Sequence, residues 1–94
     1  MNVQRAEVLM VVFPFHEGTG SKLRPVVVIQ CDNDNLRMGT TIVAMITKNT
    51  RLAAREPRHV LIDIETDDGR ASGLWMTSVV NCSQLATVGD DRIV

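Results

Sequence analysis

Residues 13–30 have the sequence FPFHEGTGSKLRPVVVIQ, and this stretch predicts the fold. Its centre is small and polar, with glycines at positions 18 and 20, and it lies between two apolar runs. β-Branched residues such as the valines at 26–28 are typical of strands, and glycines between two such runs are typical of a connecting loop. We therefore predict two strands joined by a polar loop, and we expect the chemistry of the protein to lie at this loop.

Arg24 opens the second of these strands, and Pro25 follows it directly. A proline at the start of a strand removes no ladder hydrogen bond and fixes the backbone there. The guanidinium of Arg24 is thereby held on an ordered element, which suits a planar group that binds phosphate through paired hydrogen bonds. The alternative role is an exposed ion pair with a surface carboxylate, which is common for surface arginines.

Further short strands are predicted along the rest of the chain. The strand-like runs occupy residues 8–13, 26–30, 41–47, 58–64, 76–82 and 84–88, with a bend expected at Ser83. The first two runs are continuous and apolar apart from Gln30 at the end of the second, as expected where both faces of a sheet are covered. Turn-prone residues lie at 32–35 and 67–69, and only residues 52–55 are expected to form a helical turn. Five or six short strands with short connections predict a mainly β or all-β protein, folded as a small antiparallel barrel.

The length of 94 residues predicts one domain, which we place over residues 1–94. A chain this short has a small core, so a homodimer would help to complete it. Hydrophobic residues make up 45% of the chain and aromatic residues only 3%, which predicts an aliphatic core. The scarcity of aromatic residues also disfavours an RNA-binding platform on which bases stack against Phe or Tyr.

The formal net charge of −1 disfavours a protein that binds nucleic acid through its overall charge. The charges are nevertheless uneven, because the first 62 residues carry eight of the ten basic residues and five of the eleven acidic ones. We therefore expect local positive potential around residues 22–24 and 48–58, where an acidic partner could bind. The alternative is a solvated basic surface without a partner.

Several other chemistries are disfavoured by the spacing of the candidate residues. Cys31 and Cys82 follow strand-like runs, and we expect both to be buried free thiols. The two cysteines and two histidines are too scattered for zinc, residues 32–35 lack the remaining ligands of a calcium loop, and residues 18–22 lack the spacing of a P-loop. We therefore expect neither a metal nor another cofactor.

No apolar run approaches the roughly 18 residues that a membrane span requires. The apolar segment at residues 8–15 is interrupted by Pro14 and lacks a cleavage site of the kind that ends a secretory signal. We therefore expect a cytoplasmic protein with no membrane partner.

The order of these segments resembles the MazF/PemK family of toxin endoribonucleases. The resemblance is carried by the motif RAEV at residues 5–8, the FPF and GSK motifs, RPVVV at 24–28, IVAMIT at 42–47 and SVVNCSQLATV at 78–88. Together these motifs extend over nearly the whole chain. The resemblance implies the SH3-like barrel shared by MazF, PemK and CcdB toxins, and a dimer of two barrels with a shared RNA groove. Relatives continue into a C-terminal helix, which we expect to be missing here because the chain stops at Val94.

The resemblance also implies the activity. It predicts a metal-independent endoribonuclease that cleaves single-stranded RNA through attack by the RNA's own 2′-hydroxyl. The products would be a 2′,3′-cyclic phosphate or 3′-phosphate and a 5′-hydroxyl. A cognate antitoxin with a flexible acidic segment would block the basic groove.

Arg24 and Thr47 are assigned to the catalytic pair by the resemblance. Without it, Thr47 would be a strand-end residue that satisfies a turn. His16 has a side chain whose ordinary pKa suits proton transfer, and some relatives carry a His-Glu pair in this loop. Catalysis, substrate contact and simple solvation all remain open for His16.

Other residues are candidates for binding RNA. Gln84 stands where other relatives carry a glutamine, and its amide could bind a base edge of single-stranded RNA. Asn81 and Ser83 stand where some PemK-type enzymes use an Arg and an Asp, so that catalytic set is missing. The full set of expected RNA-binding residues is Glu17, Ser21, Lys22, Lys48, Ser78 and Gln84.

Two alternative functions remain open at this stage. The same barrel serves CcdB-like inhibitors of DNA gyrase, and fold alone does not determine function. CcdB-like chains depend on their C-terminal end, which is short here. A catalytically weak barrel that only binds partners would also fit the substitutions at Asn81 and Ser83.

Overall fold

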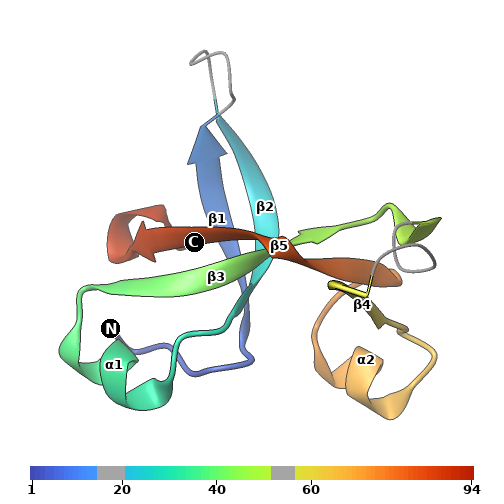
Figure 1. The fold of residues 1–94 in the computed structure, drawn as a ribbon, viewed down its shortest axis with the longest axis horizontal. Helices are drawn as coiled ribbons and strands as arrows, with labels where there is room; N and C mark the ends of the chain where they lie inside the picture. The colour runs from blue at the N-terminus through green and yellow to red at the C-terminus, as the bar shows by residue number, and fades with distance from the viewer. Residues whose placement is uncertain (15–20, 52–56) are drawn as a thin grey trace.

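The computed structural model describes residues 1–94 except 15–20 and 52–56 (Figure 1). The described residues form five strands, two short α-helices and a 3-10 helix. The strands are β1 (Val8–Pro14), β2 (Ser21–Val28), β3 (Thr40–Thr47), β4 (His59–Ile62) and β5 (Ser78–Gly89); the helices are α1 (Asp32–Arg37), α2 (Asp67–Ala71) and the 3-10 helix η2 (Asp90–Arg92). The prediction of a mainly β protein is confirmed. None of the helices in this described part of the chain has the length and apolar character to cross a membrane.

The five strands form one antiparallel sheet in the order β1-β2-β3-β5-β4. After η2, the chain returns to the first edge of this sheet. Ile93 forms an antiparallel bridge with Val11, and the backbone N–H of Val94 donates to the carbonyl oxygen of Met10 at 2.9 Å. The end of the chain therefore pairs with β1, as expected for a small barrel-like fold.

β5 is one long strand, although the sequence predicts two strands at 76–82 and 84–88. Its pairing with β3 shifts in the middle, because Ala44 pairs with Leu85 whereas the next residue, Met45, pairs with Asn81. The expected bend at Ser83 falls inside this irregularity, where the Asn81 side chain accepts hydrogen bonds from both the N–H and the hydroxyl of Ser83. The irregular stretch lets one strand change direction without a break, as β-bulges do.

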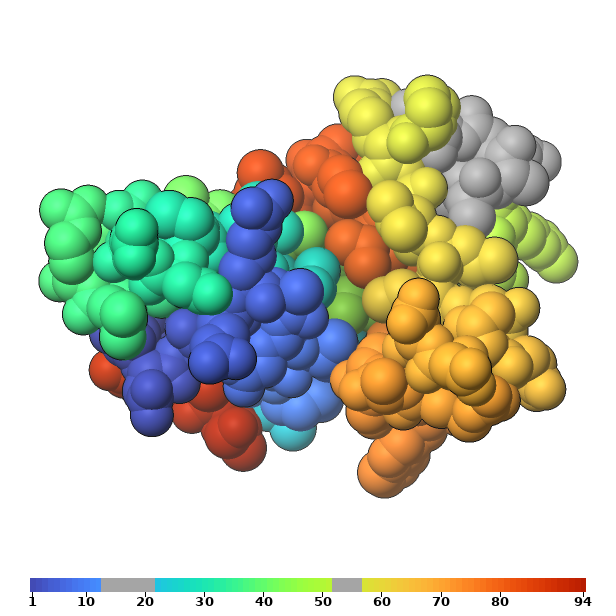
Figure 2. All heavy atoms as spheres, turned by 90° about the horizontal axis from the view of Figure 1, so that it is seen from below, coloured from blue at the N-terminus to red at the C-terminus, as the bar shows by residue number. Residues whose placement is uncertain are grey.

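The valine-rich strands bury both of their faces, as their uninterrupted apolar runs predict. An inner cluster on one face consists of the buried residues Val11, Val26, Val28, Val43 and Val88. An outer cluster on the other face consists of the buried residues Ala44, Ile46 and Val80, with Val8, Val27, Ile29, Ile62 and Leu74 packed against them. Leu74 follows α2, so the α2 segment covers part of the outer face. Figure 2 shows this segment, in orange, beside the N-terminal part of the chain, in blue.

Two segments predicted as turns are short helices. In α2, the side chain of Thr66 accepts a hydrogen bond from the backbone N–H of Gly69 at 3.0 Å and so caps the helix. α1 contains the fully buried Asn35, whose side chain bonds to the segment before it and to β3. These contacts join residues only three to six positions apart, and they fold the segments into helical turns that a turn signal alone does not specify. The helical turn predicted at 52–55 lies outside the described residues.

The prediction of buried thiols is wrong, because Cys31 and Cys82 are both exposed free cysteines. Cys31 is the N-cap residue of α1, where its Sγ donates to a carboxylate oxygen of Asp34. Cys82 lies in the irregular stretch of β5, beyond the regular pairing in which Val79 and Val80 are buried. Each cysteine therefore follows a buried strand segment but lies where that segment leaves the core.

Candidate functional site

A pocket opens where β2 and β3 stop pairing. These strands pair only from Val28 opposite Val43 to Val26 opposite Met45. The earlier half of β2 continues beside β1, whereas the end of β3 continues beside β5. The strands diverge there around a pocket of about 460 Å³. Its lining residues are Met10, Lys22, Leu23, Arg24, Pro25, Ile46, Thr47, Lys48, Gly73, Leu74, Trp75, Met76 and Ser78.

Pro25 occupies the position at which the β2–β3 pairing has ended. Because proline has no backbone N–H, it cannot donate to a ladder, and strands favour it at a start or an edge. On its other side, Pro25 still lies opposite Met10 of β1. The sequence therefore encodes the end of the pairing at the residue next to Arg24.

Arg24 and Thr47 come from the two sides of this gap. Arg24 lies two residues before Val26, and Thr47 lies two residues after Met45. Because side chains alternate along a strand, Arg24 and Thr47 project to the face shared by Val26 and Met45. Val26 belongs to the inner cluster, and the partly buried Met45 packs against it. The divergence thus places the predicted catalytic pair at the open end of that cluster.

Thr47 has a structural contact as well as a free hydrogen-bonding capacity. Its hydroxyl oxygen accepts a hydrogen bond from the backbone N–H of Asn49 at 3.2 Å, as a strand-end turn requires. A threonine hydroxyl can also donate one hydrogen bond and accept a second. The turn therefore orients the oxygen and leaves the hydroxyl hydrogen available for a ligand, so the two roles are compatible.

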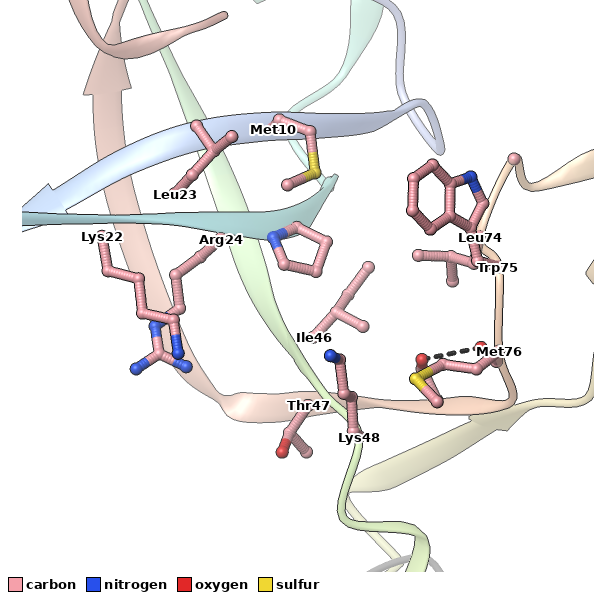
Figure 3. A pocket seen from close by; sticks show the side chains of 13 residues that line it. Met10, Lys22, Leu23, Arg24, Ile46, Thr47, Lys48, Leu74, Trp75 and Met76 are labelled. Atoms are coloured by element: carbon pink, nitrogen blue, oxygen red, sulfur yellow. Dashed lines mark hydrogen bonds between the residues drawn. The ribbon is translucent and has the colours of Figure 1, made fainter.

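Three cations line the same pocket. Lys22 and Arg24 are two residues apart on β2 and point in the same direction, and Lys48 points into the pocket from the end of β3 (Figure 3). All three are exposed. Between residues that the structure describes, ion pairs join Arg37 to Asp34 and Arg70 to Asp67, and neither pair uses a cation of the pocket.

No acidic side chain is among the described residues that line the pocket. Its local charge is therefore positive, although the whole chain has a formal net charge of −1. A concave surface with uncompensated cations raises the local concentration of anions. The chemistry of the pocket favours a phosphate-bearing ligand.

The opposite wall of the pocket is apolar and includes Trp75, which sequence analysis missed. The indole stands across the pocket from Lys22 and Arg24, next to Leu74 (Figure 3). Trp75 is 97% exposed. The low aromatic content led us to disfavour base stacking, but composition does not locate a single tryptophan. One feature of the sequence could have indicated an exposed aromatic side chain here: the only tryptophan of the chain stands two residues after a glycine, outside the predicted strands.

A family model described as PemK-like, MazF-like toxin of type II toxin-antitoxin system matches residues 4–94. The chain belongs to this family. The resemblance inferred from its motifs is thereby confirmed, and a PemK-like toxin of a type II system implies a cognate antitoxin as its partner. No curated protein matches the chain.

The remaining candidates in this PemK-like toxin differ in their relation to the pocket. Ser78 lines it but is buried, and its hydroxyl donates to the carbonyl oxygen of Met76 at 2.9 Å, so it also supports the loop. Gln84 is exposed in the irregular stretch of β5 and is not among the lining residues. His16 and Glu17 lie outside the described residues. Ser21 starts β2 opposite Pro14, and only its backbone is described.

Among the residues that the structure describes, no group of three or more His, Cys, Asp or Glu side chains is close enough to hold a metal ion. The polar groups of the pocket are instead ammonium, guanidinium and hydroxyl groups, which donate hydrogen bonds to an anion.

Proposed function

We propose that this toxin is an endoribonuclease that cleaves single-stranded RNA without a metal ion. The observation that carries the proposal is the placement of Arg24 and Thr47 on one face, on opposite sides of the gap between β2 and β3. A phosphate bound at the gap could accept hydrogen bonds from both side chains. Membership in the PemK-like, MazF-like toxin family supports the same activity.

RNA supplies its own nucleophile in the proposed reaction. The 2′-oxygen forms a bond to the adjacent phosphorus, and the bond from phosphorus to the 5′-oxygen breaks. A proton leaves the 2′-hydroxyl, and a proton is added to the departing 5′-oxygen. The immediate products are a 2′,3′-cyclic phosphate and a 5′-hydroxyl. The protein must hold the RNA in line, stabilise the extra negative charge on phosphorus and move the two protons.

Arg24 is proposed to stabilise the charge of the transition state. Its guanidinium is permanently charged and can donate two parallel hydrogen bonds to the phosphate oxygens. Thr47 would donate its free hydroxyl hydrogen to the same phosphate, and its bond from Asn49 would keep the oxygen in position. His16 is proposed to move one of the protons, with Glu17 beside it in the loop. Lys22 and Lys48 would bind neighbouring phosphates as point charges.

The cognate antitoxin is proposed to bind the same surface as the RNA. It would bind through a flexible acidic segment, which the three pocket cations would attract.

We also propose a homodimer that forms through another surface. The exposed apolar residues Val60 and Leu61 lie on the edge strand β4, where a second copy could cover them. Sedimentation that detects only a 10.4 kDa species at micromolar concentration would contradict the dimer. The proposed place of action is the cytoplasm, where messenger RNA is translated.

The test is cleavage of a long unstructured RNA by purified protein in the presence of EDTA, with the new 5′ ends mapped. We expect cleavage to continue in EDTA and Arg24→Ala to slow it by at least about 100-fold, the scale of removing one transition-state donor. Arg92→Ala is the matched control, because Arg92 is exposed in η2 and is not a lining residue. It should cut at the parental rate.

Three outcomes would contradict the proposal in different ways. Cleavage that stops in EDTA would overturn metal independence. A folded Arg24→Ala variant that cuts at the parental rate would remove Arg24 from the mechanism. Intact RNA together with inhibited DNA gyrase would favour the CcdB-like alternative.

A further inference from the structure

We propose that Trp75 forms a subsite for one unpaired base of the RNA, across the pocket from the cations that bind its phosphates. The inference rests on the proposed function and deepens it, because it names the residue that holds a base near the reacting phosphate. It starts from the exposure of the side chain. An aromatic side chain this large is usually mostly buried, whereas Trp75 is 97% exposed.

The exposure of Trp75 does not come from a loose loop. On one side, the backbone N–H of Leu74 donates to the Ser72 hydroxyl at 3.2 Å, and the Leu74 side chain packs against the outer cluster. On the other side, the carbonyl oxygen of Met76 accepts a hydrogen bond from the buried Ser78. The loop is therefore anchored on both sides of Trp75, and the indole is presented to solvent by a fixed backbone.

Gly73 contributes to this presentation. Its φ angle of 81° lies in the left-handed region, which glycine adopts without steric cost. This residue turns the chain out of α2 so that the next residues cross the outer face. The backbone thus directs the indole toward the pocket, where Figure 3 shows it opposite Lys22 and Arg24.

The surroundings of the indole favour a nucleobase. Met10 and Met76 supply polarisable sulfurs on the same lining, and sulfur packs favourably against flat aromatic rings. The cations across the pocket supply partners for the phosphates to which a base is joined. A pocket of about 460 Å³ lies within the usual range for small-ligand sites and accepts one nucleotide rather than a duplex.

A side chain of an acidic protein segment is a less suitable occupant. Apolar anchors of protein partners fill enclosed sockets at the centre of an interface. Trp75 instead offers a nearly free flat face, which matches the face of an unstacked base in single-stranded RNA. Every base has such a face, so the subsite should add affinity at one nucleotide with little dependence on sequence.

The chain provides its own probe for this subsite. It contains one tryptophan and no tyrosine, so its intrinsic emission above 300 nm reports on Trp75 alone. We would titrate the protein with a short single-stranded 2′-O-methyl oligonucleotide, which lacks the nucleophile and is not cleaved. A second oligonucleotide with the same number of phosphates but no bases serves as the matched ligand. Anisotropy of fluorescein-labelled copies measures binding independently of tryptophan.

The base-bearing oligonucleotide should quench the emission of Trp75 and bind more tightly than the abasic one. Trp75→Ala should weaken binding of the base-bearing oligonucleotide by about 5- to 150-fold, the range for losing one stacked base. It should leave binding of the abasic oligonucleotide unchanged, and Trp75→Phe should restore most of the loss. The control variant is Leu36→Ala, an exposed apolar residue of α1 outside the pocket. It should bind both oligonucleotides like the parent.

The outcomes separate this inference from the proposed function. If the parent cleaves RNA but its emission does not change on binding, or if Trp75→Ala binds like the parent, the subsite is wrong and the nuclease stands. If RNA is not cleaved and neither oligonucleotide binds, the proposed function fails and the subsite fails with it. Quenching by a flexible acidic peptide, with no quenching by the oligonucleotide, would assign the surface to a protein partner and overturn the inference.

Discussion

Replacing Thr47 by valine would separate the structural role of its hydroxyl from the proposed chemical one. Valine keeps the β-branched shape and removes the hydroxyl. In the structure, that hydroxyl accepts one hydrogen bond, from the backbone N–H of Asn49 at 3.2 Å. Asn49 is exposed, so water can replace the lost acceptor. The expected loss of unfolding free energy is therefore at the low end for one hydrogen bond, about 0.5 kcal/mol.

This structural cost is small compared with the expected catalytic cost. A loss of about 0.5 kcal/mol lowers the melting temperature of a domain of this size by about 2–4 °C. A protein with the usual stability of several kcal/mol stays folded at 25 °C after such a change. Losing a transition-state donor instead slows the reaction by about 100-fold, or about 2.7 kcal/mol. The two roles therefore differ about fivefold in free energy and appear in different measurements.

The assay is single-turnover cleavage of an RNA oligonucleotide at 25 °C, with a thermal melt of each variant. Thr47→Val should cleave about 100-fold more slowly and melt only a few degrees lower. Thr47→Ser keeps the hydroxyl and should retain most of the rate. A valine variant with the parental rate would return Thr47 to its turn role. A serine variant as slow as the valine variant would show that the methyl group matters, and would refute the assignment of the hydroxyl.

Three further predictions concern the two short helices α1 and α2. Asn35→Ala should lower the free energy of unfolding by about 3 kcal/mol in urea titrations, because the fully buried side chain makes three hydrogen bonds. Gly69→Ala should destabilise the protein by about 2 kcal/mol and raise hydrogen exchange in α2, because a Cβ there would overlap the carbonyl oxygen of Asp63. The hydrogen bond from Arg37 lowers the pKa of Asp34, so its stabilising effect is present above the ordinary pKa of aspartate and is lost as the pH falls through the lowered value. Arg37→Gln should therefore raise the pKa of Asp34 in an NMR titration.

The strands were predictable because their short apolar runs are rich in β-branched residues, as strands covered on both faces are. The runs that contain Val11 and Val26 are apolar apart from Gln30 at the end of the second, and the structure places alternate residues in the inner and outer clusters. The turn signals did not predict the short helices, because each helix depends on particular side-chain and backbone contacts that a turn signal does not specify. Gly69 of α2 lies so close to the backbone of Asp63 that a Cβ would overlap its carbonyl oxygen, and the Asn35 side chain of α1 bonds to Gln30 and to Thr41 of β3. The bond to Thr41 forms only where β3 packs beside the helix.

The candidate site was predictable in its residues but not in its geometry. Sequence motifs indicated Arg24 and Thr47, and the proline after Arg24 indicated a boundary in the strand. Their common face depends on the register of β2 against β3 and on the residue pair at which pairing stops. The position of Trp75 across the pocket was likewise not predictable from the sequence, because it depends on how its neighbour Leu74 packs against the outer cluster.

The position of the pocket also explains how a chain with a net charge of −1 could bind a polyanion. Potential at a surface depends on the charges within about one Debye length, roughly 8–10 Å, more than on the total. The helices α2 and η2 carry acidic residues, but no residue within either helix lines the pocket, whereas Lys22, Arg24 and Lys48 all line it. Acidic surfaces elsewhere would repel RNA, and the diverging ends of β2 and β3 would attract it. An overall negative charge can therefore direct a single strand toward the gap that holds Arg24 and Thr47, because it disfavours binding at other faces.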